Sequence, residues 1–207
     1  MENLSLEQMT QEHLDVLKEL GNIGAGNATT ALAQMLGCKL DMSVPQVKIL
    51  EFYEVGSLIG GEEQILVGVY LAIEGDINGS IMFLMGMETA KHLVGKLMPP
   101  EMMEADGSFS EMELSALQEV GNIITGAYLN SLAALTNMVI IPSTPALAID
   151  MAAAILSIPA IEFGTMRDNI LLINTRFFDD MALDGYFILI PEVDSYAKML
   201  SSLGIPV

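Results

Sequence analysis

The sequence repeats itself at an interval of 100 residues, and this repeat limits the possible folds more than any other feature. Residues 14–33 align with residues 114–133 without a gap, and nine of the twenty positions are identical. In the first copy the identical positions are Leu14, Leu17, Glu19, Gly21, Asn22, Ile23, Gly26, Leu32 and Ala33. The same register continues to Ser43/Ser143, Pro45/Pro145 and Ile49/Ile149. Because chance seldom produces such agreement, we expect two copies of one structural unit, related by a pseudo-two-fold axis.

Each copy contains the same order of predicted elements. A helix with apolar residues at helical spacing is predicted over about 8–36 and again over about 109–137. An extended segment follows the proline of each copy, and two β-rich runs and a short closing helix come next. The apolar run Met151–Ile158 predicts a further helix in the second half, ended near Pro159. Residues 98–108, with two prolines and several charges, form the predicted linker. The sequence therefore predicts an α+β fold and leaves open how the strands of the two halves pair.

The composition argues against several classes of protein. The chain is 52% hydrophobic with a mean hydropathy of +0.48, yet it lacks the roughly 18 uninterrupted apolar residues of a membrane span. Its net charge of −19, from 27 acidic and 8 basic residues, is repelled by nucleic acid and by anionic lipid, so neither is an expected partner. The N-terminal segment lacks the basic and apolar regions of a secretory signal, and the single cysteine, Cys38, fits a reducing compartment. We expect a soluble cytoplasmic protein.

Three glycines in the first helix raise the alternative of a phosphate-binding loop. Gly21, Gly24 and Gly26 have the spacing G-x-x-G-x-G rather than G-x-G-x-x-G, and no strand is predicted before them. Gly21 and Gly24 share one helical face with Ala25 and Ala28, and such a face lets a neighbouring element approach the backbone closely. We therefore expect these small residues to serve packing.

A polar trio occurs at the same helical spacing in both copies. The glutamate and the asparagine are three residues apart and so about 60° apart around the helix, with the first member of the trio between them. A solvated helix face would explain one such set, but asparagine is a poor helix former, and two sets with identical spacing favour a function. The first trio is Asp15, Glu19 and Asn22, and the second trio is Ser115, Glu119 and Asn122.

The chemistry available to these trios is limited. They offer too few converging ligands for a metal ion, and they contain no activated nucleophile. An amide donates and accepts hydrogen bonds at once and can hold a water molecule, as the water-orienting glutamine of GTPases does, while a carboxylate can bind a lysine. Each trio is therefore half of an active site, able to align water on a phosphoryl group that another protein supplies together with Mg²⁺. The other reactive residues add no second site, since His13 and His92 are expected at the surface without partners and Cys38 is expected to be inert.

The trios belong to a longer pattern that resembles a known signature. Asp or Ser, three residues, Glu, two residues, Asn, twenty-two residues and Pro is the signature of the CheC/CheX/FliY family of chemotaxis phosphatases. It occurs twice here without a departure, ending at Pro45 and Pro145, and the length and the doubling resemble the CheC branch. The resemblance covers nearly the whole chain. It implies one CheC-like domain over 1–207, built of repeats at about 8–98 and about 109–204, with long helices packed on an antiparallel β-sheet.

This resemblance also implies an activity, the hydrolysis of the aspartyl phosphate of the response regulator CheY. Asn22 and Asn122 would orient the attacking water, while Glu19 and Glu119 would pair with the lysine of the regulator's acidic pocket. Mg²⁺ would belong to CheY, and the chain would need no cofactor of its own.

The remaining motif residues receive supporting roles from the resemblance. Asp15 and Ser115 would support or contact the partner. Pro45 and Pro145 would be structural, fixing the start of the strand that follows each long helix.

A second partner is implied as well, the receptor-modifying deamidase CheD. Its expected contact is the apolar segment 149–158 with Asp150, although a plain buried helix explains that segment equally well. An exposed apolar patch there would favour the interface. The alternative to an enzyme is a non-catalytic binding module, a CheD partner or flagellar-switch adaptor that captures phosphorylated CheY with little turnover.

Overall fold

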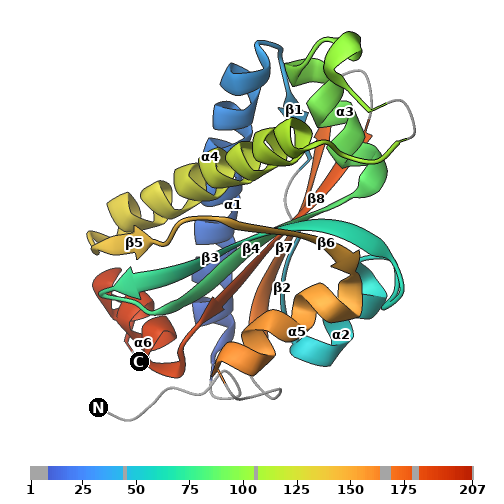
Figure 1. The fold of residues 1–207 in the computed structure, drawn as a ribbon. Coiled ribbons are helices and arrows are strands. Elements are labelled where there is room, and N and C mark those ends of the chain that lie inside the picture. Colours follow the sequence, from blue (N-terminus) through green and yellow to red (C-terminus); the bar gives the residue numbers. More distant parts are fainter. Residues whose placement is uncertain (1–8, 44–45, 105–106, 164–168, 179–181, 207) are drawn as a thin grey trace.

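A computed structural model describes residues 9–43, 46–104, 107–163, 169–178 and 182–206 (Figure 1). Helices and strands follow the same order in both halves of the chain. The first half contains α1 (Gln11–Leu36), β1 (Asp41–Met42), β2 (Gln46–Glu51), α2 (Phe52–Leu58), β3 (Ile65–Gly75), β4 (Gly79–Gly86) and α3 (Met87–Leu97). After the short 3₁₀ helix η2 (Pro100–Met102), the second half contains α4 (Glu111–Thr136), β5 (Ile140–Pro142), β6 (Ala146–Met151), α5 (Ala152–Phe163), β7 (Asn169–Phe178), β8 (Ala182–Pro191) and α6 (Val193–Ser202).

These strands form one antiparallel sheet, in which the two halves exchange strands. The order is β1-β7-β8-β4-β3-β5, and β2 also pairs with β7 while β6 also pairs with β3. Thus the six-residue strand that follows each long helix joins the sheet of the opposite half. The central strands β4 and β8 pair with each other, and the pseudo-two-fold axis passes between them. The predicted α+β fold with two related halves is confirmed.

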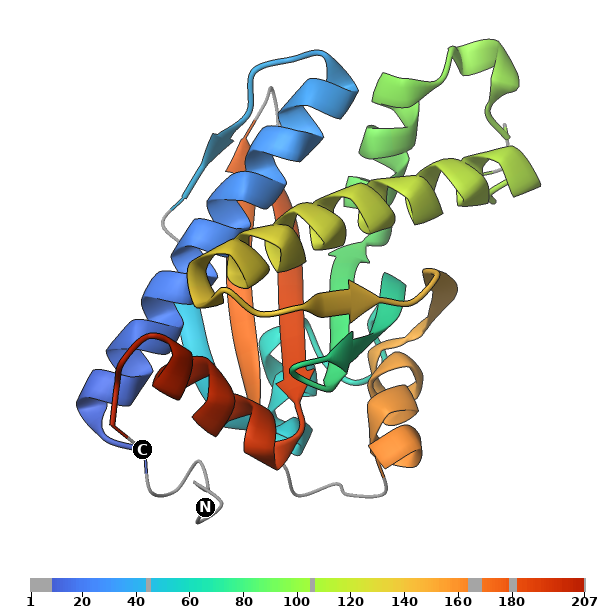
Figure 2. The ribbon, with the colours of Figure 1, turned by 90° about the vertical axis from the view of Figure 1, so that its left-hand side faces the viewer.

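Helices cover both faces of this sheet. The central strand β4 shows why, because its alternate residues point to opposite faces and both sets are buried. Ile81, Phe83 and Met85 pack in the cluster that includes α1, α3, α4 and α6, whereas Met82 and Leu84 pack with α2 and α5. Figure 2 shows α1 and α4 crossing each other in front of the sheet. The two long helices therefore lie together on one face.

Local signals set the ends of the two long helices. Each is 26 residues long and begins with a capping box, at Thr10 for α1 and at Ser110 with Glu113 for α4. Each ends at a residue in the left-handed conformation, Gly37 with φ 63° and Asn137 with φ 54°.

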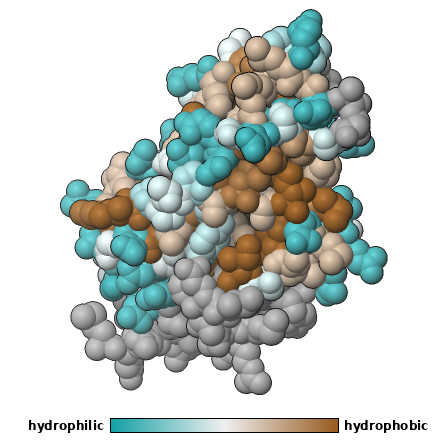
Figure 3. Space-filling view, viewed as in Figure 1, coloured by the Kyte–Doolittle hydropathy of each residue, from teal (hydrophilic) through white to brown (hydrophobic). Residues whose placement is uncertain are grey.

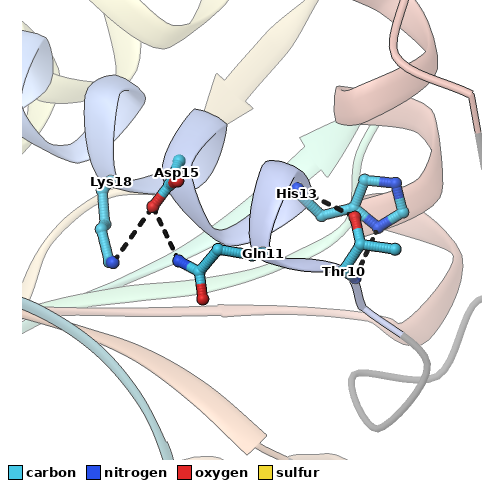
Figure 4. A network of polar contacts seen from close by, with 5 residues as sticks. All are labelled: Thr10, Gln11, His13, Asp15 and Lys18. Carbon is cyan, nitrogen blue, oxygen red and sulfur yellow. Dashed lines mark hydrogen bonds and ion pairs between the residues drawn. The ribbon is translucent and has the colours of Figure 1, made fainter.

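The two histidines differ from the expectation of exposed side chains without partners. His13 is 6% exposed, and its Nδ1 accepts a hydrogen bond from the Thr10 amide at 3.2 Å (Figure 4). Its Nε2 lies 2.9 Å from the carbonyl oxygen of Pro206, so this side chain both caps α1 and holds the C-terminal segment. His92 on α3 is half-buried and also interacts with a neighbouring residue. The expectation of surface residues without partners is therefore wrong for both histidines.

Small residues allow the close crossing of α1 and α4. Gly21, Gly24, Ala25 and Ala28 are all buried. A Cβ added at Gly24 would lie 2.4 Å from Cε2 of Tyr128 on α4, well inside van der Waals contact. The expectation that these residues serve packing is confirmed.

Two helices on the other face differ from the expectation. The predicted end near Pro159 is wrong, since α5 continues to Phe163. A proline removes one amide donor and can kink a helix without ending it. No sequence pattern predicts the seven-residue α2, because it is too short to show a period. Tertiary packing holds it, with Val55 and Ile59 in the same cluster as α5.

Among the helices of the described residues, none has both the length and the apolar character that crossing a membrane requires.

Candidate functional site

Each long helix presents its polar trio at the surface. Asp15 and Glu19 of the first trio are exposed and Asn22 is half-buried, and the second trio shows the same exposures. This pattern follows from the amphipathic helices, because other faces of α1 and α4 pack on the sheet and on each other. Both trios are thus accessible to another protein.

In the second trio the polar groups are bonded within α4. Nδ2 of Asn122 donates to Oε2 of Glu119 at 3.5 Å, a long hydrogen bond that a substrate group can replace. The hydroxyl of Ser115 donates to the carbonyl of Glu111 at 2.8 Å, one helical turn earlier. The amide and the carboxylate therefore lie side by side at the surface.

The first trio has a different electrostatic setting (Figure 4). Oδ1 of Asp15 accepts a hydrogen bond from Nε2 of Gln11 at 2.9 Å and one from Nζ of Lys18 at 3.2 Å. The hydrogen bond from Gln11, followed by that from Lys18, holds the pKa of Asp15 below its ordinary value. Asp15 is therefore ionised at neutral pH, whereas Ser115 at the matching position carries no charge.

The amide of Asn22 also differs from that of Asn122. Its Oδ1 is buried and has no hydrogen-bond partner among the described residues. The two copies thus share the positions and residue types of the glutamate and the asparagine, but not the same hydrogen bonds.

A further contact ties the second trio to the strand that follows it. Nε2 of Gln118 donates to the carbonyl oxygen of Pro145 at 2.6 Å. Gln118 lies one helical turn before Asn122, so this bond fixes the start of β6 beside the second trio. The sequence does not predict this contact, because its partners are 27 residues apart and belong to different elements. In the first copy Lys18 occupies the matching position, and Pro45 lies outside the described residues.

Asp150, the expected contact for a second partner, lies on the strand β6. It is exposed and pairs in register with Leu66 of β3. Three apolar side chains on β3, β6 and α5 are exposed, Ile65 at 42%, Met151 at 44% and Ile158 at 36%. We call these three residues the β6–α5 patch, and Figure 3 shows hydrophobic surface over this part of the molecule. The apolar segment is therefore not wholly buried.

The described residues contain no group of three or more His, Cys, Asp or Glu side chains arranged to hold a metal ion. The chemistry of the trios is that of a carboxylate beside an amide, which can bind a cationic side chain and hold a water molecule.

Comparison with known proteins decides the family. The model of the CheC-like family matches residues 12–49 and 112–149. The protein of Bacillus subtilis named CheY-P phosphatase CheC is 35% identical over 198 residues, covering 94% of this chain and 95% of that protein. The chain belongs to the CheC-like family. Each matched segment holds one complete trio, so the two CheC-like matches coincide with the two copies found in the sequence.

More distant relatives share the CheC-like arrangement. A Halobacterium salinarum protein named putative CheY-P phosphatase CheC1 is 24% identical over 190 residues, covering 92% of this chain and 95% of that protein. The crystal structure of Thermotoga maritima FliY is similar with a TM-score of 0.77 at 21% identity, covering 95% of this chain and 98% of that chain. The expected CheC-like fold, with long helices on an antiparallel sheet, is confirmed.

Proposed function

We propose that this CheC-like protein hydrolyses the aspartyl phosphate of phosphorylated CheY. One observation carries the proposal. Two exposed trios occupy matching positions on α1 and α4 of a chain that is 35% identical, over 94% of its length, to a protein named CheY-P phosphatase CheC.

In the proposed reaction the chain supplies position rather than a reactive group. The amide of Asn122 holds a water molecule by donating from Nδ2 and accepting at Oδ1. The amide of Asn22 does the same after its side chain turns to bring the buried Oδ1 to the surface. The water oxygen attacks phosphorus, the bond from phosphorus to the aspartyl oxygen breaks, and the products are inorganic phosphate and a free carboxylate on CheY. Holding the water in line removes much of the entropic barrier. Mg²⁺ bound to CheY neutralises charge on the phosphoryl oxygens.

The acidic side chains hold the partner in the proposed complex. Glu19 and Glu119 pair with the lysine of the regulator's phosphorylation pocket, a contact that charge complementarity favours. Asp15 and Ser115 lie one turn before them and contact the edge of the docked regulator. We place the reaction in the cytoplasm, a compartment that the free Cys38 fits.

We also propose CheD as a second partner, bound at Asp150 and the β6–α5 patch. Exposed apolar side chains are typical of protein interaction sites, and Met151 follows Asp150 directly in β6. Met151→Lys should weaken CheD binding in a calorimetric titration, and unchanged binding would remove the patch from the interface.

Asparagine substitutions test the catalytic proposal. Asn22→Ala and Asn122→Ala each remove one water-holding amide, so each single variant should retain the activity of the other site. Asn22→Ala/Asn122→Ala should decrease the catalysed part of CheY dephosphorylation by about 100-fold, as expected when a positioned polar group is removed from each site, so that the decay returns to the intrinsic rate of CheY.

The assay follows the decay of phosphorylated CheY and, separately, the binding of CheY activated with beryllofluoride and Mg²⁺. Binding should survive in the double variant, because the glutamates remain. A double variant that hydrolyses at the wild-type rate would overturn the role of the amides. A wild-type protein that binds activated CheY but leaves its decay unchanged would support the binding-module alternative instead.

A further inference from the structure

The glycines inside the long helices are of two kinds. At Gly24 and Gly121 an added Cβ would lie 2.4 Å from the ring of Tyr128 and 2.5 Å from Val69, respectively, so close packing explains these glycines. At Gly26 and Gly126 nothing among the described residues lies within 4 Å of an added Cβ. Packing therefore gives no reason for glycine at the second pair of positions.

Backbone conformation gives no reason either. Gly26 and Gly126 both lie in the interior of 26-residue α-helices, and neither has a positive φ. Glycine is one of the poorest helix-forming residues, so alanine would stabilise both helices. A residue that destabilises its own helix, with no packing contact in the molecule to offset the loss, is typical of a functional position.

The position of these glycines relative to the trios indicates a role in docking another protein. Gly26 follows Asn22 by four residues, and Gly126 follows Asn122 by four, so each lies one turn beyond the asparagine on the same side of its helix. Both glycines are half-buried and reach the surface. A protein that docks over the asparagine would meet bare helix backbone at this point.

We propose that Gly26 and Gly126 are the positions at which the docked regulator approaches the helix backbone, and that they set how deeply it seats over each asparagine. The inference rests on the proposed function. With glycine, atoms of the regulator can contact the Cα of the helix directly. A larger side chain would hold the regulator away from the helix, and a shift of about 1 Å is enough to misplace a reacting water.

The test isolates the second site by using Asn22→Ala as the parent, in which only the second trio keeps its amide. Gly126→Ala and Gly126→Leu are added to this parent, and steady-state hydrolysis of phosphorylated CheY is measured with thermal unfolding. Alanine and leucine both have a higher helix propensity than glycine, so the melting temperature of each variant should rise. KM should rise about tenfold for alanine and further for leucine, as expected when a close contact is overpacked. The value of kcat should fall in the same order, because the water is held out of line.

Ala134→Leu in the same parent is the matched control. It adds the bulk of a leucine to an exposed position of the same helix, eight residues and about 12 Å beyond Gly126. Its KM should stay within about twofold of the parent, as for most surface substitutions.

The outcomes separate this inference from the proposed function. A parent without activity above that of Asn22→Ala/Asn122→Ala would show that the second trio is not a catalytic site. A parent that is active, with Gly126→Leu variants that keep its KM and its kcat, would overturn the inference alone. A rise in KM together with a rise in melting temperature supports it, because a merely structural glycine would not produce that combination.

Discussion

The crossing of α1 and α4 allows a quantitative prediction for Gly24→Ala. The new Cβ would lie 2.4, 2.5 and 2.9 Å from three ring atoms of Tyr128, where ordinary carbon contacts are about 3.5–4.0 Å. The ring has no room to retreat, because Tyr128 is fully buried and stacks on Phe187 with ring centroids 5.4 Å apart. Relief therefore requires a shift of about 1 Å between the helices or a strained tyrosine rotamer, which costs about 1–3 kcal/mol.

The helix preference opposes this loss and has to be subtracted. Alanine stabilises a helix interior by about 0.8–1.0 kcal/mol relative to glycine. Gly26→Ala measures that gain directly, because it lies two residues away on α1 and an added Cβ meets nothing within 4 Å among the described residues. Gly24→Ala should therefore be less stable than Gly26→Ala by about 1–3 kcal/mol, while Gly26→Ala should be more stable than the wild type by about 0.5–1 kcal/mol.

Urea unfolding followed by circular dichroism measures both variants under the same conditions. The midpoint of Gly26→Ala should rise, and that of Gly24→Ala should stay at the wild-type value or fall, with unchanged slopes because neither substitution alters the surface exposed on unfolding. If Gly24→Ala proves as stable as Gly26→Ala, the close contact between α1 and Tyr128 does not limit packing, and the reasoning is refuted.

Three further predictions concern the ionisable groups of Tyr128 and Asp15. The buried hydroxyl of Tyr128 has no hydrogen-bond partner among the described residues, so Tyr128→Phe should raise the free energy of unfolding by about 1 kcal/mol in urea unfolding, and a loss instead would contradict an unpartnered hydroxyl. Burial raises the pKa of the Tyr128 phenol, so ionisation of this group opposes folding and the fold should weaken as pH rises above the unfolded-state pKa. Tyr128→Phe should reduce this alkaline sensitivity. At the first trio the lowered pKa of Asp15 means that its contacts act above the unfolded-state pKa and are lost as pH falls through the folded-state value. Gln11→Ala should move the Asp15 carboxyl titration, followed by NMR, to higher pH, and an unmoved titration would contradict the assigned cause.

The sequence predicted the elements that carry a long, regular signal. The two long helices, the β-rich runs and the buried glycine face of α1 could be found because apolar residues repeat with a period of 3.6 or form strand-length runs. The exposure of both trios could be predicted for the same reason, because the apolar buried face of each long helix determines which face lies at the surface. Short elements such as β1, β5 and α2 could not, because two to seven residues contain no period.

Contacts between distant segments were also beyond prediction from the sequence. The exchange of β2 and β6 between the halves depends on pairing across more than seventy residues. The same apolar pattern would also suit strands that pair within their own half. The bonds from Gln118 to Pro145 and from His13 to Pro206 join side chains to backbone carbonyls, which every residue has and which leave no mark in the sequence. Local patterns thus predicted the buried and exposed faces of the long helices, with His13 as an exception, while tertiary structure decided what each side chain touches.

The exchange of strands also explains where a difference between the two trios can arise. Each long helix is followed by a strand that pairs with the other half, and α1 and α4 pack directly against each other, so neither trio rests on an independent scaffold. The backbones of both trios therefore belong to one packed unit. Side chains beside the trios are not shared, and Lys18 with Asp15 on α1 forms a setting unlike that of Gln118 with Ser115 on α4. We therefore expect the two sites to diverge through such neighbours, while the common fold keeps each glutamate and asparagine at the same helical spacing.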